Sequence, residues 1–131
     1  MAKGKILLID DEQIFLVAHH EELQDAGYAI VTALTGKDAI TVVAKEKFDI
    51  VYVDLVMPDM NGVEVCKEIK KMSPDTVVVL VSGQPKEILK YWKSFLDAGG
   101  KDKILRKPLR DKELIKVTED IIEERKEERR G

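Results

Sequence analysis

The stretch FDIVYVDLVMPDMNG, residues 48–62, passes from an apolar segment straight into a carboxylate. The segment IVYV at 50–53 is followed directly by Asp54, and MPDMNG follows at 57–62. A short apolar run without polar alternation is typical of a strand that is buried on both faces, as in a parallel sheet. We therefore predict a central strand that carries Asp54 at its carboxyl end, and a sharp turn after it.

Four further apolar runs predict four more strands, and helical patterns separate the runs. These runs lie at residues 6–9, 28–31, 77–81 and 104–105. A strand followed by a helix, repeated five times, predicts an α/β fold with right-handed crossovers. We expect a (βα)5 doubly wound, five-stranded parallel sheet with helices on both faces.

Small polar residues are expected to cap several helices. Thr35, with Asp38 three residues later, predicts the start of the second helix. Either Asp59 or Asn61 is expected to cap the third helix, and Asp111 the fifth. The first helix, from about residue 13 to residue 26, has a less regular pattern, and its expected inner face is formed by Phe15, Ala18, Leu23 and Ala26.

Composition limits the classes of function that fit this chain. With 131 residues, 44% of them hydrophobic, the chain can form one ordinary domain with a core. Its net charge of -3 does not favour nucleic acid or an anionic membrane surface. The N-terminus lacks a signal-peptide pattern, and no apolar stretch approaches the roughly 20 residues of a membrane span. The single cysteine, Cys66, fits a reducing compartment, so a soluble cytoplasmic protein is expected.

Polar side chains follow four of the five predicted strands. Asp10 and Asp11 follow the first strand, Asp54 the third, Ser82 the fourth and Lys107 the fifth. The carboxyl ends of parallel strands lie along one edge of the sheet, where ligands of open α/β sheets bind. The sequence therefore predicts that these five side chains form one site.

The residue types in this predicted site suit phosphoryl transfer with a bound cation. Three neighbouring carboxylates repel one another, and a divalent cation relieves that repulsion. Oxygen ligands favour Mg²⁺, which leaves coordination positions for phosphate oxygens. A carboxylate can act as a nucleophile and form an aspartyl phosphate. Lys107 could add positive charge, and the hydroxyl of Ser82 could donate a hydrogen bond to a phosphoryl oxygen.

Four segments in order, KILLIDDE, VDLVMPDMNG, VVVLVSG and ILRKPL, give the chain a clear resemblance to a known family. The chain resembles the receiver domain of two-component response regulators. The resemblance extends from about residue 3 to residue 122, so we expect residues 1–122 to form the receiver domain. It implies a flavodoxin-like sheet with the strand order 2-1-3-4-5.

The resemblance also implies a role for each residue of the site. Asp54 would be the phosphoacceptor, and a histidine kinase the phosphoryl donor. Mg²⁺ would be held by Asp10, Asp11, Asp54 and the backbone carbonyl of Val56, with Asp11 favoured over Asp10 as a direct ligand. Ser82 and Lys107 would contact the phosphoryl group, and the Lys107-Pro108 peptide bond is expected to be cis.

This chain departs from the common pattern of the family at several positions. Where the family often has an aromatic residue that moves on phosphorylation, three residues before the lysine, this chain has Ile104. Val56 and Gln84 occupy positions that tune phosphoryl lifetime in the family. The longer segment between Ser82 and the lysine contains Tyr91, Trp92 and Phe95, for which we favour a role in the core over a docking role.

The expected function is a phosphorylation switch and not an enzyme. The output would be another protein or domain, with no direct binding of nucleic acid or membrane, and a homodimer through the fourth helix, fifth strand and fifth helix is one option. A haloacid-dehalogenase-type phosphatase would need an aspartate where this chain has Val56. A receiver fold without phosphorylation is the remaining alternative, and His19 and His20 are expected to be ordinary helix positions.

The C-terminal tail, residues 123–131, is a run of charges. Its pairs at i, i+4 have the same sign, as in Glu123 with Glu127 and Arg125 with Arg129, and such pairs weaken a helix. We expect the tail either to extend the last helix or to fray unless a partner holds it. Whether the chain stands alone or is part of a longer regulator or hybrid kinase stays open.

Overall fold

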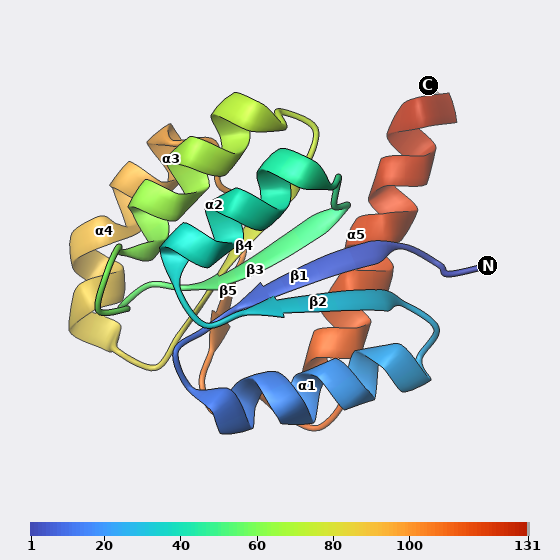
Figure 1. The fold of residues 1–131 in the computed structure, drawn as a ribbon, viewed down its shortest axis with the longest axis horizontal. Coiled ribbons are helices and arrows are strands. Elements are labelled where there is room, and N and C mark those ends of the chain that lie inside the picture. Colours follow the sequence, from blue (N-terminus) through green and yellow to red (C-terminus); the bar gives the residue numbers. More distant parts are fainter. Residues whose placement is uncertain (131) are drawn as a thin grey trace.

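A computed structural model describes residues 1–130 of the chain, and within them five parallel strands form one sheet (Figure 1). The strand order is β2-β1-β3-β4-β5, which confirms the predicted flavodoxin-like topology. The strands are β1 (Lys5–Ile9), β2 (Ala29–Ala33), β3 (Ile50–Asp54), β4 (Val77–Ser82) and β5 (Ile104–Arg106).

Five helices cover the two faces of this sheet. They are α1 (Gln13–Asp25), α2 (Gly36–Lys45), α3 (Gly62–Met72), α4 (Pro85–Asp97) and α5 (Glu113–Arg130). In Figure 1, α2, α3 and α4 lie on one side of the sheet, and α1 and α5 lie on the other. The predicted doubly wound architecture is therefore confirmed.

Successive side chains along a strand enter two different hydrophobic cores, because side chains alternate between the faces of a sheet. Leu7, Val51 and Val53 pack with α2, α3 and α4, whereas Ile6 and Tyr52 pack with α1 and α5. All of these side chains are buried, which accounts for the absence of polar alternation in their strands.

The caps of α2 and α3 come from three polar side chains. The side chain of Thr35 accepts a hydrogen bond from the Asp38 amide, as predicted. Asn61 caps α3 in a capping box with Glu64. Asp59, the alternative cap for α3, instead accepts hydrogen bonds from the Gly36 and Lys37 amides at the start of α2. Desolvation of this exposed carboxylate would raise its pKa, but the hydrogen bonds from the Lys37 and Gly36 amides outweigh that effect and lower the pKa of Asp59.

Two local predictions were wrong. Ala18 is exposed on α1, and the buried side chains of this helix are Leu16 and Leu23. Asp111 is not the residue before α5; that position is held by Lys112, which has a φ of 62°. The start of α5 is stabilised differently, since the side chain of Glu113 accepts a hydrogen bond from the Arg110 amide at 2.8 Å.

The end of α5 is held by contacts within the chain. The helix continues to Arg130, so residues 123–130 extend it. The guanidinium of Arg125 donates to the Asp75 carbonyl and lies 3.5 Å from a carboxylate oxygen of Asp49. The tail is thus helical despite its like-charge pairs, and Arg125 ties this part of the helix to the rest of the domain. Among the described helices, none combines the length and apolar character that a membrane crossing requires.

Gly62 allows α3 to begin close to the end of β3, which leads to the first prediction. A Cβ at this position would lie 2.7 Å from the Asp54 carbonyl oxygen and 3.0 Å from the Leu55 Cα, both backbone atoms. We expect Gly62→Ala to lower the free energy of unfolding by about 2 kcal/mol or more, because backbone cannot yield as a side chain can. Urea denaturation measures this change.

Gly83→Ala is the matched control for Gly62→Ala. Its nearest contact would be the side-chain Cβ of Lys107 at 3.3 Å, so we expect a loss of less than about 1 kcal/mol. Equal losses at the two glycines would show that the close approach at Gly62 does not constrain the fold.

Candidate functional site

Three carboxylates meet at the carboxyl edge of the sheet. Asp10 and Asp11 directly follow β1, and Asp54 is the last residue of β3. One oxygen from each of the three lies within 4.8 Å of the others. Asp10 and Asp54 are buried, with 1% and 8% of their surfaces exposed, whereas Asp11 is exposed. The structure thus brings together the three aspartates that the sequence singled out.

The ammonium group of Lys107 lies among these carboxylates. Its Nζ is 2.6 Å from Asp10 Oδ2 and 3.7 Å from Asp54 Oδ2. A third acidic side chain, Glu12, places Oε1 at 2.7 Å from the same nitrogen. Burial alone would lower the pKa of Lys107, but the hydrogen bonds to Asp10 and Glu12 raise it. Lys107 is therefore a firmly charged cation at the centre of the site.

Ser82 and Lys107 are brought together by the pairing of β4 with β5. Ser82 is fully buried at the end of β4 and pairs in register with Arg106. The Lys107 amide donates to the Ser82 carbonyl at 3.0 Å, and the Ser82 hydroxyl accepts from the Gln84 amide at 3.3 Å. The Lys107-Pro108 peptide bond is cis, as the family resemblance implied.

The carboxylates outnumber the cations in this buried site, and their pKa values respond. Burial, together with the charge of Asp10, raises the pKa of Asp54 to about 6, although Lys107 opposes the shift. Burial also raises the pKa of Asp10, and Lys107 offsets that shift in part. One lysine does not neutralise the buried negative charge, so the site favours additional positive charge.

The donor set fits Mg²⁺. All of the side-chain donors are carboxylate oxygens, which are the ligands that this hard cation prefers. Asp11 is exposed, so a cation bound beside it would be open to solvent and could keep several of its water ligands. Asp10, Asp11 and Asp54 are accordingly the side chains that would hold the ion.

A pocket of about 610 Å³ opens beside the carboxylate of Asp54. Lys107, Glu12 and Phe15 form part of its wall, and Gly83 and Gln84, from the turn after β4, form another part. The pocket opens a route from solvent to a carboxylate that is otherwise buried. The sequence analysis did not place Glu12 and Phe15 at this site, although Glu12 directly follows the two aspartates in the segment LIDDE.

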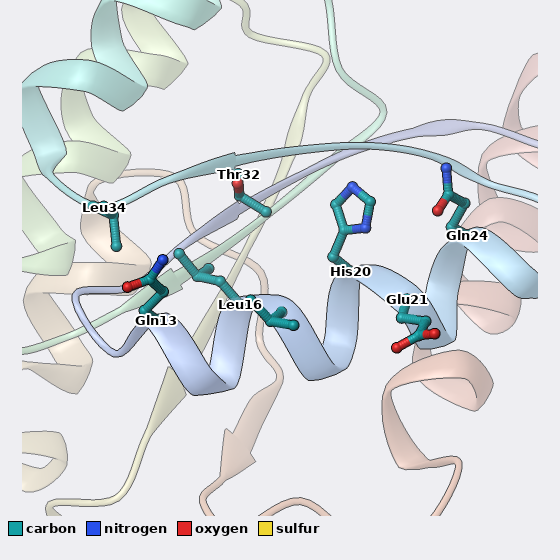
Figure 2. Close-up of a pocket in the computed structure, with 8 residues that line it drawn as sticks. Gln13, Leu16, His20, Glu21, Gln24, Thr32 and Leu34 are labelled. Carbon is teal, nitrogen blue, oxygen red and sulfur yellow. The ribbon is translucent and has the colours of Figure 1, made fainter.

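A second groove, of about 490 Å³, lies between α1 and β2 (Figure 2). Figure 2 shows Gln13 and Leu34 toward one end of this groove and His20 and Gln24 toward the other. None of the residues that line it belongs to the predicted site. His19, the neighbour of His20, pairs with Glu22 at 3.1 Å, which is an ordinary contact within a helix.

The fold and the site agree with a family match over most of the chain. A model described as the response regulator receiver domain matches residues 6–119. The chain therefore belongs to the family of response regulator receiver domains.

Two curated relatives are much longer than this chain. The chain is 28% identical over 110 residues to the alkaline phosphatase synthesis transcriptional regulatory protein PhoP of Bacillus subtilis, covering 84% of this chain and 45% of the relative. It is 31% identical over 124 residues to a protein-glutamate methylesterase/protein-glutamine glutaminase of Clostridium acetobutylicum, covering 93% of this chain and 36% of the relative. The chain thus spans less than half the length of either relative.

A solved structure matches almost the whole chain. It is a CheY-like response regulator receiver domain protein from Methanospirillum hungatei JF-1, with a TM-score of 0.88 and 26% identity. The match covers 95% of this chain and 97% of that one.

The raised pKa of Asp54 leads to a prediction about stability. Between pH 3.8 and about 6 the folded protein binds more protons at Asp54 than the unfolded chain does, so this carboxylate reduces stability as the pH rises through that window. We expect Asp54→Asn to raise the free energy of unfolding at pH 7 without Mg²⁺ by about 1 to 2 kcal/mol. The gain should shrink as the pH falls toward 4, and chemical denaturation across pH measures it.

Asp59→Asn is the control for Asp54→Asn, since it removes an exposed carboxylate whose pKa is lowered. We expect it to reduce stability at neutral pH, and the loss to vanish as the pH falls below the pKa of an ordinary aspartate. A loss of stability in Asp54→Asn at pH 7 would contradict the prediction that the ionised, buried carboxylate of Asp54 destabilises the folded protein.

Proposed function

We propose that this receiver domain accepts a phosphoryl group on Asp54 from a histidine kinase, in a Mg²⁺-dependent reaction, and thereby changes its affinity for a partner. One observation carries the proposal: a buried carboxylate at the tip of β3 lies in one cluster with two further aspartates and a lysine. This arrangement supplies a nucleophile, an acidic cation site and a positive charge at one edge of the sheet.

In the proposed reaction, an oxygen of Asp54 attacks the phosphorus of the donor. The phosphorus–nitrogen bond of the phosphohistidine breaks as the bond to Asp54 forms, and the imidazole leaves with its electron pair. With a pKa of about 6, Asp54 is mostly ionised at neutral pH and can act as the nucleophile. Bound Mg²⁺ would neutralise charge on the phosphoryl oxygens.

Three groups of the chain complete the proposed site. The ammonium of Lys107 would move from 3.7 Å toward the phosphorylated Asp54, and the hydroxyl of Ser82 would donate a hydrogen bond to a phosphoryl oxygen. The backbone carbonyl of Val56 would complete the protein ligands of the metal. These roles follow the family resemblance, and the observed positions of the side chains support them.

The output is proposed to be a protein or domain that binds the surface of α4, β5 and α5. Ser82 ends β4, the strand before α4, and Lys107 directly follows β5, the strand after it, so a change at either side chain would reach this surface by a short route. A homodimer through the same surface is part of the proposal. As a switch, the chain would have no catalytic turnover and would act in the cytoplasm, without direct contact with nucleic acid or membrane.

Val56 separates this proposal from the phosphatase alternative. A haloacid-dehalogenase-type phosphatase needs an acid–base aspartate two residues after the nucleophile, and this chain has a valine there. An aspartyl phosphate formed on Asp54 would therefore have no acid–base aspartate beside it to speed its hydrolysis.

Intact-mass spectrometry tests the proposed phosphorylation. After incubation with acetyl phosphate and Mg²⁺, we expect one phosphoryl adduct per chain. The adduct should disappear without Mg²⁺ and in Asp54→Asn, because the first lacks charge neutralisation and the second lacks the nucleophile. A folded protein that gains no adduct would favour the receiver fold without phosphorylation.

Thermal unfolding tests the proposed metal site. At a Mg²⁺ concentration five times the dissociation constant, we expect a stabilisation of about 1 kcal/mol. Asp11→Asn should weaken Mg²⁺ binding about ten-fold or more, because it removes a charged oxygen ligand. Asp38→Asn, which changes an exposed aspartate on α2, is the control and should bind Mg²⁺ as the unaltered protein does.

A further inference from the structure

Lys107 lies closer to Asp10 and Glu12 than to Asp54. An ammonium group has three N–H donors. Two acceptors, Asp10 Oδ2 at 2.6 Å and Glu12 Oε1 at 2.7 Å, lie within hydrogen-bond distance of Nζ. Asp54 Oδ2, at 3.7 Å, lies beyond that distance. The hydrogen-bond-distance contacts of the lysine are thus to Asp10 and Glu12, in the turn between β1 and α1, and its ion pair with Asp54 is longer.

An aromatic face completes this arrangement. The Lys107 ammonium lies 4.6 Å from the centroid of the Phe15 ring, a distance at which cation–π attraction operates. The ring is itself supported by His19, whose centroid lies 4.4 Å away. Glu12 and Phe15 thus contact one ammonium group, and both lie on the wall of the Asp54 pocket.

The backbone fixes Glu12 in position for this contact. Glu12 immediately precedes α1, and its amide donates a hydrogen bond to Asp10 Oδ1 at 2.9 Å. The same Asp10 side chain contacts Lys107 through its other oxygen. Asp10 therefore links the backbone of Glu12 to the ammonium that the Glu12 side chain binds.

We propose that Glu12 and Phe15 are positioning residues that hold Lys107 in a resting place and compete with the phosphoryl group for it. This inference rests on the proposed phosphorylation of Asp54. In the resting site Asp10, Glu12 and Phe15 share the ammonium. When Asp10 turns to a metal ion, Glu12 and Phe15 are the contacts that still compete with the group on Asp54 for Lys107. The strength of these two contacts then sets how favourable the phosphorylated state is.

Beryllofluoride, which binds carboxylates in the geometry of a phosphoryl group, measures this competition at equilibrium. We expect Glu12→Gln to bind beryllofluoride in saturating Mg²⁺ about two- to five-fold more tightly, as for the loss of one exposed ion pair. The same variant should bind Mg²⁺ alone about two-fold more weakly, since a freed Lys107 competes better for Asp10 and Asp54. Phe15→Leu should also tighten beryllofluoride binding, by about two-fold.

Two control variants separate the contact with Lys107 from general charge. Glu12→Asp keeps the charge but is one methylene shorter, so it should lose the contact and behave like Glu12→Gln. Glu21→Gln removes a charge from an exposed position of α1 that does not line the Asp54 pocket, and it should leave both affinities unchanged. If Glu12→Asp matches the unaltered protein while Glu12→Gln does not, charge alone acts and the positioning role is wrong.

Nitrogen-15 NMR of the lysine ammonium groups tests the resting contact without any phosphorylation. We expect a slowly exchanging Lys107 signal in the metal-free protein, and its loss in Glu12→Gln and Glu12→Asp. An unchanged signal in both variants would overturn the inference even if Asp54 is phosphorylated normally. Conversely, failure of the unaltered protein to bind beryllofluoride or to gain a phosphoryl adduct would overturn the proposed function, and this inference with it.

Discussion

The balance of charge around one partly buried lysine, Lys107, governs the carboxyl edge of the sheet. Asp10 and Asp54 follow paired positions of neighbouring strands, since Ile9 of β1 pairs with Val53 of β3. Both carboxylates are buried, and burial raises the pKa of each. Lys107 offsets part of this cost and leaves a deficit of positive charge. A divalent cation would reduce that deficit, so the charge repulsion in the site and the proposed binding of Mg²⁺ would have the same physical origin.

The backbone around the site is what keeps these charges together. Gly62 lets α3 begin against the carbonyl of Asp54. The Lys107 amide bonds to the Ser82 carbonyl, so the ends of β4 and β5 cannot separate without breaking the sheet ladder. Charged groups that repel one another are thus confined by close packing, which is a way for a functional site to store unfavourable energy that a ligand can release.

The sequence was sufficient for features set by local pattern and insufficient for those set by tertiary contact. Each apolar run marks a strand, and Asp54 and Ser82 directly follow two of these runs. Their positions at strand ends could therefore be predicted from the sequence alone. The contact between Glu12 and Lys107 joins residues 95 positions apart, and nothing local signals it. The contacts of Asp59 with the start of α2 are likewise between residues far apart in the sequence, and so are the bonds of Arg125 to Asp75 and Asp49, which no local pattern signals. On α1, Leu16 is buried and the predicted Ala18 is not, because the apolar pattern of this helix is too weak to identify its inner face.

Ile104 bears on how the proposed switch would reach its partner surface. Ile104 is partly buried in the same cluster as Ile88 and Trp92 of α4, so β5 and α4 are joined there by packing. A branched aliphatic side chain has no ring to swing between two positions. The displacement would then have to pass through the backbone from Lys107 to Ser82 and into the turn before α4. That helix begins at Pro85, and the side chain of its N-cap residue, Gln84, makes no capping hydrogen bond, so the start of the helix can shift at little energetic cost.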